Sequence, residues 1–391
     1  MKVGYSRLEI TPPLGITING FWEPRYADGI LDPLYATAVA FSDGEKTAVV
    51  VSLDILELIQ SDTDPLRARI GEKFGIDPDA VLLHCTHTHT GPVVSKILFE
   101  PDPNYVDFLY KRITDAVGFA IADLKEAKAF IGRAEAKNVA HIRRYIMADG
   151  TLKTHPRPGD PDIREKQGLE DEEVQLIRIT REGGHDVAIV NFQCHLNSIG
   201  GNKISADLTH YVRLALEGAL ADVADGKGVK VAYFSGAQGD TCCVDLKNPK
   251  YGKYILIQNV GRTVAAAALT AYTYAEEVNF EGIGYKQVEA EVPEYGEDEE
   301  AYNIHMTAIR IGDVGFIGYP GEPYTEIGRR VKQGSAYKMT INTCMTNGWI
   351  SYIPTREAIP YGSMGVNPKR NPDVEDICVN TAIELSKETS K

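Results

Sequence analysis

The segment HCTHTHTGP, residues 84–92, concentrates three of the nine histidines of the chain just before the break at Gly91-Pro92. The apolar run Val81-Leu82-Leu83 leads into this segment and is typical of a buried strand. Side chains two residues apart lie on one face of a strand, so we expect His87 and His89 to point together beyond the strand end. Two converging imidazoles could bind one metal ion or one substrate. The alternative is a polar strand end with incidental histidines.

The composition is that of a globular protein with a sizeable core, since 43% of the 391 residues are hydrophobic and 25% are charged. The formal net charge of -14 argues against nucleic acid and anionic membrane surfaces as partners, although a local basic cleft stays compatible with it. No run approaches the roughly 18 apolar residues of a membrane span. Residues 1–7 contain no secretion signal and the six cysteines show no paired spacing, so we expect a cytoplasmic protein with reduced thiols. A homo-oligomer is compatible with the sequence.

Apolar runs and helical patterns alternate along the chain and predict an α/β fold, with a mixed β-sheet core flanked by helices. We expect one domain over residues 1–391, because no linker, repeat or low-complexity tract divides the chain. Residues 61–65 (SDTDP) should begin a helix with N-cap chemistry and a proline in the first turn. Residues 156–171, rich in proline, glycine and charge, should form a surface excursion or lid. Further predicted helices cover residues 105–124, 206–223, 254–274 and 373–387, and predicted hairpins cover residues 174–192 and 304–319.

One pattern recurs: apolar strands end in a chemically capable residue, usually with a glycine or proline close by. These strand ends carry Asp54, His87 with His89, His195, Asp240 and Glu322. Sites in open α/β sheets collect beyond the carboxyl ends of strands, so these side chains are expected to meet. Histidines, a carboxylate and an open position describe a catalytic zinc site, which polarises a carbonyl and lowers the pKa of bound water to about 7.

Each of these residues also has a simpler interpretation. His195 alone could be a satisfied core histidine, and Glu322 alone a carboxylate at a helix start. For Asp240 three roles stay open: a general base, a partner of a histidine, or a turn residue. The glycine loop GAQGD, residues 236–240, lacks the ending of a phosphate loop, but its N–H groups could approach a substrate oxygen. His84, an odd number of residues from His87, should face away and has no predicted role.

The following motifs occur in order across nearly the whole chain: ITPPLG, GILDPLYATAV, THTHTGP, NFQCH, ISADLTHYV, GAQGD, YPGEPYTEIGRR and NGWISYIPTREAI. Together they resemble the zinc-dependent catalytic domain of the neutral/alkaline ceramidase family. The resemblance implies helices packed around a mixed β-sheet and a Zn²⁺ site of two histidines, a glutamate and a tyrosine. The residues that match these ligands are His87, His195, Glu322 and Tyr352. His89 matches a histidine that lines the site beyond the metal, and Arg143 matches an arginine near the scissile carbonyl.

The chain departs from the family pattern at Cys242, which holds the position of a serine implicated in catalysis. This thiol could be a nucleophile if a neighbour lowered its pKa, or it could line the pocket. The chain ends soon after the Tyr352 region, so we expect no C-terminal β-sandwich domain like that of full ceramidases. An acidic cytoplasmic protein is also not expected to act on membrane-embedded ceramide.

The sequence therefore predicts a zinc-dependent hydrolase that cleaves a linear amide bond of a small soluble N-acyl substrate. Zinc would bind water and the carbonyl, His89 or Asp240 would move protons, and Arg143 would stabilise the oxyanion. Hydrolysis of an ester, lactone or sugar derivative at the same site is an alternative, as are iron or manganese in place of zinc. A protein that binds a ligand without catalysing its turnover is the alternative outside the class of enzymes. A metallo-β-lactamase is disfavoured because Gly91-Pro92 stand where its Asp-His would follow, and a barrel amidohydrolase because a strand ending at Asp54 precedes the histidines.

Overall fold

Apolar strands build a central sheet in the part of the chain that the computed structural model describes, residues 1–249, 253–295, 300–362 and 365–390. Its nine strands follow the order β16-β14-β13-β8-β1-β5-β6-β7, with β18 paired to β8. The pairs β14/β16 and β6/β7 are parallel and the others antiparallel, so the sheet is mixed, as predicted. The strands are β1 (Lys2–Glu9), β5 (Tyr35–Ser42), β6 (Thr47–Leu53), β7 (Val81–Cys85), β8 (Lys125–Glu135), β13 (Glu173–Arg181), β14 (Asp186–Phe192), β16 (Val229–Ser235) and β18 (Glu276–Glu277).

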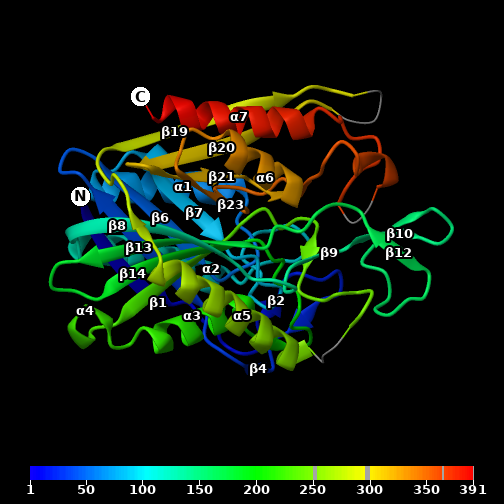
Figure 1. The fold of residues 1–391 in the computed structure, drawn as a ribbon, viewed down its shortest axis with the longest axis horizontal. Coiled ribbons are helices and arrows are strands. Elements are labelled where there is room, and N and C mark those ends of the chain that lie inside the picture. The colour runs from blue at the N-terminus through cyan, green and yellow to red at the C-terminus, as the bar shows by residue number, and fades with distance from the viewer. Residues whose placement is uncertain (250–252, 296–299, 363–364, 391) are drawn as a thin grey trace.

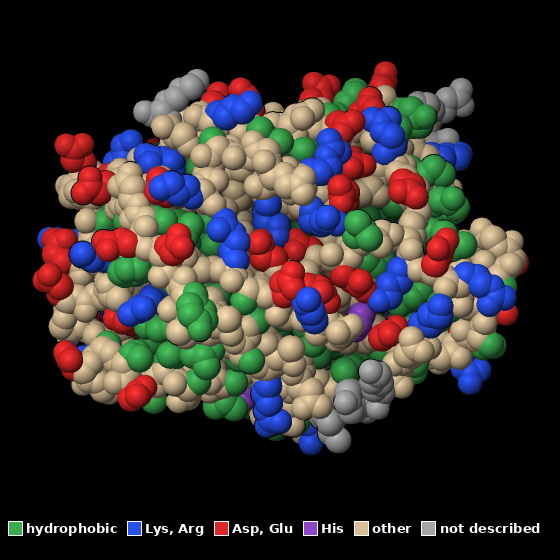
Figure 2. Space-filling view, in the orientation of Figure 1, with side chains coloured by type: hydrophobic (Ala, Val, Ile, Leu, Met, Phe, Trp, Pro, Cys, Tyr) green, Lys and Arg blue, Asp and Glu red, His purple; other side chains and the backbone are tan. Residues whose placement is uncertain are grey.

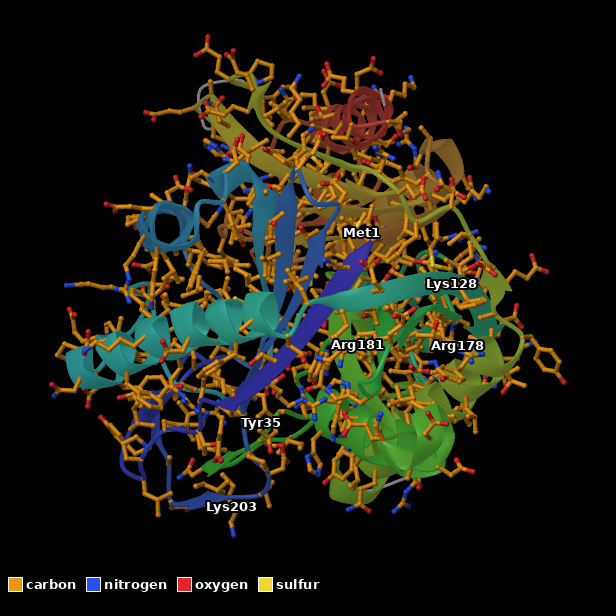
Figure 3. All side chains as sticks on the ribbon, turned by 90° about the vertical axis from the view of Figure 1, so that its left-hand side faces the viewer. Met1, Tyr35, Lys128, Arg178, Arg181 and Lys203 are labelled. Atoms are coloured by element: carbon orange, nitrogen blue, oxygen red, sulfur yellow. The ribbon has the colours of Figure 1, made fainter. Side chains whose placement is uncertain are left out.

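The central sheet bends sharply where β1 meets β8. These two strands pair only through Lys2 with Glu126 and Val3 with Lys125. Beyond that corner β8, which carries Lys128, runs at an angle to β1 (Figure 3). The bend lets β16 pack across β5 and β6. The carboxyl ends of strands from both halves therefore approach one another.

His84 joins the two halves of the bent sheet. Its Nε2 accepts a hydrogen bond from the Ser235 N–H at 3.0 Å, at the end of β16. Its Nδ1 lies 2.6 Å from the carbonyl oxygen of Cys344. Burial lowers the pKa of His84 to about 3, so the ring is neutral. This structural use agrees with the expectation that His84 has no place in the site.

A second, four-stranded sheet packs on the central one and completes a layered structure. Its order is β19-β20-β21-β23, and Phe316 of β21 contacts the rings of Phe41 and Phe234 in the central sheet. Helices α6 and α7 cover the outer face of this second sheet, whereas α2, α3 and α5 cover the central sheet (Figure 1). These strands are β19 (Ile283–Val292), β20 (Tyr302–Ile311), β21 (Val314–Gly318) and β23 (Met339–Thr343).

Seven α-helices occur in the described residues: α1 (Gln60–Phe74), α2 (Pro103–Ala122), α3 (Leu208–Ala219), α4 (Val223–Gly226), α5 (Lys253–Thr273), α6 (Thr325–Gly334) and α7 (Val374–Glu388). Short 3-10 helices are η1 (Pro78–Ala80) and η2 (Ile359–Tyr361). The remaining strands form small ladders: β2 (Thr17–Ile18), β3 (Arg25–Tyr26), β4 (Gly29–Ile30), β9 (His141–Ile142), β10 (Arg144–Met147), β11 (Leu152–Thr154), β12 (Ile163–Lys166), β15 (Lys203–Ile204), β17 (Thr241–Cys242), β22 (Glu322–Pro323) and β24 (Tyr352–Ile353). No helix among the described residues is both long and apolar enough to cross a membrane.

The long predicted elements are confirmed, and the local details differ. Both hairpins form, as β13/β14 and β20/β21. The predicted N-cap of α1 is wrong, because the cap is Ile59, which uses no side chain and donates its N–H to Ser95 Oγ at 3.2 Å. The predicted lid, residues 156–171, contains β12, which pairs with β10 in a small sheet at one side of the molecule (Figure 1).

Candidate metal centre

The loop after β7 brings His87 and His89 together. β7 ends at Cys85, and His87 has φ 71°, in the left-handed region that residues other than glycine rarely adopt. The N–H groups of His87 and His89 donate at 3.0 Å to the carbonyl oxygens of Ile55 and Leu196. The two rings converge with centroids 4.9 Å apart. The predicted convergence is confirmed, but the predicted strand geometry is wrong because the backbone turns at His87.

His195 reaches the pair from the loop after β14. Its N–H donates to Thr241 Oγ1 at 3.1 Å, which ties this loop to β17. The His195 ring centroid lies 4.7 Å from that of His87 and 4.9 Å from that of His89. Each of the three side chains offers a nitrogen within 4.8 Å of the others, a spacing that could hold one metal ion.

Glu322 and Tyr352 lie at the metal centre as direct partners in a short parallel ladder. β22 pairs with β24 so that Glu322 lies opposite Tyr352, and the Glu322 N–H donates to the Ser351 carbonyl at 3.0 Å. Neighbouring strands are about 4.8 Å apart, so the two side chains enter the same region. Glu322 is 3% exposed. The ladder explains how residues thirty positions apart in the chain reach one centre.

Three buried polar atoms at this centre lack hydrogen-bond partners: His87 Nε2, His195 Nδ1 and Glu322 Oε2. Oε2 lies 3.3 Å from His87 Nε2 and 3.6 Å from His195 Nδ1. Buried groups of this kind cost free energy unless something pairs with them. Imidazole nitrogens and carboxylate oxygens are common zinc ligands, so one divalent cation would satisfy all three atoms. The residues present therefore fit a metal such as zinc.

Backbone carbonyls set the proton positions on His87 and His89, and His89 in turn sets that on His195. Nδ1 of His87 lies 3.0 Å from Leu56 O, and Nδ1 of His89 lies 2.7 Å from Gly20 O. A carbonyl only accepts, so each Nδ1 carries the hydrogen and each Nε2 presents a lone pair. His195 Nε2 is 2.9 Å from His89 Nε2 and must donate to it. This leaves His195 Nδ1 free to bind a cation and makes His89 a partner of His195.

Electrostatics keep two of the three histidines neutral. Burial is the largest cause that lowers the pKa of both His89 and His195, and the charge of Arg143 adds to it at His195. Burial also opposes a charge on His87, but the facing Glu322 carboxylate outweighs it and raises the pKa of His87. Metal ligands must be deprotonated. The neutral ring of His195 meets this requirement, whereas His87 would release the proton that Glu322 favours when a cation binds between them.

Arg143 lies beside Tyr352 at the edge of this centre. Its side chain is buried, and Nη2 donates to Tyr352 Oη at 3.0 Å and to the Gly239 carbonyl at 2.6 Å. The neighbouring Arg144 points elsewhere, since its Nη2 donates to Ala358 O at 3.1 Å. Burial raises the pKa of the Tyr352 phenol, whereas the Arg143 charge lowers it. A buried guanidinium in this place is suited to stabilising an oxygen anion.

Comparison with known proteins agrees with this geometry at the level of fold. No family model matches the chain, and no curated protein matches its sequence. The crystal structure of neutral ceramidase from Pseudomonas aeruginosa is similar, with a TM-score of 0.81 over 98% of this chain and 74% of that one. A structure described as ceramidase complexed with C2 gives a TM-score of 0.80 with the same coverage. The fold is that of neutral ceramidase. Both structures are 17% identical to this chain, so the comparison confirms the predicted fold and leaves the activity to be argued from the site.

Within this ceramidase fold, Asp240 holds the helix that follows Glu322. Its Oδ1 accepts hydrogen bonds from Thr325 N–H at 2.8 Å and Thr325 Oγ1 at 2.7 Å, at the first residue of α6. A carboxylate is stabilising at this end of a helix. Gly239 permits the close approach of the loop, because a Cβ there would lie 2.4 Å from Glu322 O. Of the three roles left open for Asp240, these contacts support the structural one.

Asp54 does not reach the metal centre, so the expectation that all five strand ends meet is wrong. Its carboxylate is fully buried and accepts hydrogen bonds from Arg213 Nη1 at 3.1 Å and Nη2 at 2.6 Å. It also accepts from the Tyr35 N–H at 2.9 Å. The charge of Asp54 is thus neutralised in a buried ion pair that joins the end of β6 to α3.

Cys242 lies in an apolar cluster with Tyr145, Met147, Ile163 and Leu246. Its Sγ is 3.2 Å from the carbonyl of Val244, and burial raises its pKa to about 11. A thiol with a raised pKa is a poor nucleophile at neutral pH. The structure therefore disfavours the nucleophilic role considered for Cys242 and places this side chain in an apolar core cluster.

The substitution Cys242→Ala is expected to leave any hydrolytic rate within about threefold of the wild type, because the buried thiol has a raised pKa and is a poor nucleophile. Initial rates of the purified variant would be compared with those of Cys378→Ala, which removes another fully buried thiol from a different apolar cluster. Loss of turnover in Cys242→Ala alone, with zinc content unchanged, would establish a nucleophilic thiol.

Glu57 is a buried carboxyl near the centre that sequence reasoning did not select. It is 3% exposed, and its Oε1 accepts a hydrogen bond from Asn19 Nδ2 at 2.6 Å. Burial raises its pKa from 4.5 to about 7, while the nearby His87 lowers it. The available signal was the single acidic residue inside the apolar run Ile55-Leu56-Glu57-Leu58-Ile59. A carboxyl with a pKa near 7 is suited to proton transfer.

Glu57 is expected to make the metal-free protein less stable as the pH rises from about 4.5 to about 7. The folded state holds this proton more tightly than the unfolded state does. The contribution of Glu57 to stability is therefore complete below its pKa in the unfolded state. It is lost as the pH rises through its pKa in the folded state. Urea unfolding of chelator-treated protein between pH 4.5 and pH 8 should therefore show a steeper decline for wild type than for Glu57→Gln. Parallel curves for the two proteins would contradict the prediction. Glu126→Gln, at an exposed site, supplies the control.

Proposed function

We propose that this protein is a zinc-dependent hydrolase that cleaves the amide bond of a small N-acyl substrate. The observation that carries the proposal is the convergence of three unpartnered buried ligand atoms beside a buried arginine. His87, His195, Glu322 and Tyr352 would hold the zinc. When bound, zinc supplies Lewis acidity toward a carbonyl and lowers the pKa of water.

The surrounding residues would each contribute a separate function. Arg143 would direct its guanidinium toward the oxygen that gains charge during the reaction. His89 would keep His195 in the tautomer that presents Nδ1, through the 2.9 Å contact between their Nε2 atoms. Asp240 would hold the start of α6 and so the position of Glu322. Glu57, with its pKa near 7, is the buried carboxyl best suited to exchange a proton with substrate.

An exposed aromatic ring beside His89 supports an acyl group on the substrate. The Phe21 ring lies 5.9 Å from the His89 ring, and Phe21 and Trp22 are exposed. Arg25 fixes this segment, because its Nη2 donates to His89 O at 2.7 Å and its guanidinium stacks 4.1 Å from the Phe21 ring. Exposed aromatic side chains next to a polar centre suit a ligand with one apolar part.

The test is hydrolysis of matched N-acyl amides and esters with the same acyl chain by purified full-length protein. We expect amide cleavage that a chelator abolishes and that zinc restores. Ester cleavage without amide cleavage would move the assignment to the ester or lactone alternative. Tight zinc binding without turnover of either series would make the protein a binding protein and overturn the proposal.

A further inference from the structure

A cavity of about 300 Å³ lies between the two sheets and is separate from the metal centre. It is lined by side chains from β8, β13, α6 and β23 and the adjoining loops, namely Arg133, Asp171, Glu173, Gln175, Arg329, Lys332, Gln333, Lys338 and Thr340. Figure 2 shows Lys and Arg side chains gathered near the middle of this face, below the position of α6 in Figure 1, with Asp and Glu side chains alongside. None of the residues assigned to the metal centre lines this cavity.

The cavity is locally basic in a chain of net charge -14. Four cationic and two acidic side chains line it, so positive charges exceed negative ones by two. Both carboxylates are already paired with Lys332, whose Nζ lies 2.5 Å from Asp171 Oδ2 and 3.1 Å from Glu173 Oε1. Of the remaining cations, Lys338 is paired with Asp313, with Nζ 2.6 Å from Oδ2. Only Arg133 and Arg329 keep long contacts to carboxylates, so these two arginines are partly neutralised.

Arg329 has the weakest contacts to protein groups among these cations. Its Nη1 is buried and has no hydrogen-bond partner, and its nearest carboxylate oxygen, Glu326 Oε2, is 3.7 Å away. Arg133 also keeps a long contact to acid, with Nε 3.7 Å from Glu173 Oε2, while its Nη2 donates to Lys338 O at 2.6 Å. A guanidinium with unused donors is suited to binding phosphate oxygens.

Two neutral side chains at the cavity are unpartnered as well. Gln175 Oε1 and Thr340 Oγ1 have no hydrogen-bond partner, and each of these residues is 2% exposed. They come from different sheets, Gln175 from β13 and Thr340 from β23. Buried polar groups are almost always hydrogen-bonded. A polar ligand in this cavity would satisfy the guanidinium, hydroxyl and amide atoms that lack partners.

We infer that this cavity binds a small phosphate-bearing molecule. The guanidinium of Arg329 would pair with the phosphate together with Arg133, and the Thr340 hydroxyl would donate to a phosphate oxygen. Gln175 would accept from an alcohol hydroxyl of the ligand beyond its phosphate group, which a polyol phosphomonoester supplies and inorganic phosphate does not. The volume is at the small end of sites for organic ligands. The inference does not depend on the proposed hydrolase activity, because the two sites share no lining residue.

Calorimetric titration of the full-length protein with inorganic phosphate and with glycerol 3-phosphate tests the inference. We expect saturable one-to-one binding of both, tighter for glycerol 3-phosphate, and at least about tenfold weaker binding in Arg329→Gln. Thr340→Val should weaken binding by several-fold, and circular dichroism would verify that each variant is folded. Arg262→Gln, which removes an exposed arginine on α5, should bind like wild type.

Glu322→Gln separates this cavity from the metal centre, since phosphate binding should survive that change. Absence of saturable binding of either probe up to about 10 mM would overturn the inference. Equal affinity in wild type and Arg329→Gln would overturn it too. Binding of inorganic phosphate alone, with glycerol 3-phosphate excluded, would restrict the site to the free anion and contradict the assigned role of Gln175.

Discussion

His87→Ala is expected to reduce bound zinc from about one equivalent to below about a tenth and to abolish measurable hydrolysis, because it removes a direct ligand of the proposed zinc site. His89→Ala should behave differently, although it lies only two residues away. It removes the partner of His195, and loss of such an outer partner typically weakens metal binding or activity by about 10- to 100-fold. Metal analysis by mass spectrometry and initial rates on an N-acyl amide would measure both effects.

The matched control is His305→Ala. His305 lies on β20, away from the centre, and its Nδ1 contacts Gln60 Nε2 at 3.2 Å. It should keep its zinc and its rate. Full zinc content in His87→Ala would refute the ligand assignment. Identical behaviour of His87→Ala and His89→Ala would show that both histidines bind the metal directly.

Asp54→Asn is expected to lower the free energy of unfolding by about 3–5 kcal/mol, because the change leaves the Arg213 charge buried without its partner. Asparagine keeps an oxygen that can accept from the Tyr35 N–H, so the loss isolates the ion pair. Replacing both residues, as Asp54→Asn with Arg213→Met, should recover part of the stability. Urea unfolding would measure all three proteins.

Two further measurements separate this stability effect from the metal centre. Zinc content of folded Asp54→Asn should equal that of wild type, since Asp54 bonds to Arg213 and Tyr35 and not to the histidines. Glu277→Gln breaks a surface pair with Lys128 and should change stability little. A small loss in Asp54→Asn, or loss of zinc, would return Asp54 to the list of candidate site residues.

Much of the fold was predictable because its signals are local. The strands and long helices follow from continuous apolar runs and from helical spacing, which depend on neighbours a few residues apart. The start of α1 was mispredicted because the N–H of Ile59 bonds to Ser95, which lies in the loop after β7. The strand β5, with buried Ala36, Ala38 and Ala40, was not predicted as an element, since alanine favours no strand by itself.

The candidate site was only partly predictable, because its geometry depends on contacts between residues far apart in the chain. Spacing alone pointed to His87 and His89, but the left-handed turn at His87 positions the rings. Tyr352 came from family resemblance, and only its ladder with Glu322 supplies a physical reason for its place. The basic cavity could not be found from the sequence, because Gln175, Arg329 and Thr340 come from three separate elements.

The sequence by itself determined the α/β architecture, the acidic character and the short set of residues able to bind a metal. Only the tertiary structure decided which of the carboxylates at strand ends lies at the metal centre. Asp54 is neutralised by Arg213, 159 positions away, whereas Glu322 faces two histidines with an oxygen that has no hydrogen-bond partner. Whether a buried charge stabilises the fold or stays available to a ligand depends on which partner the packing brings within hydrogen-bond distance.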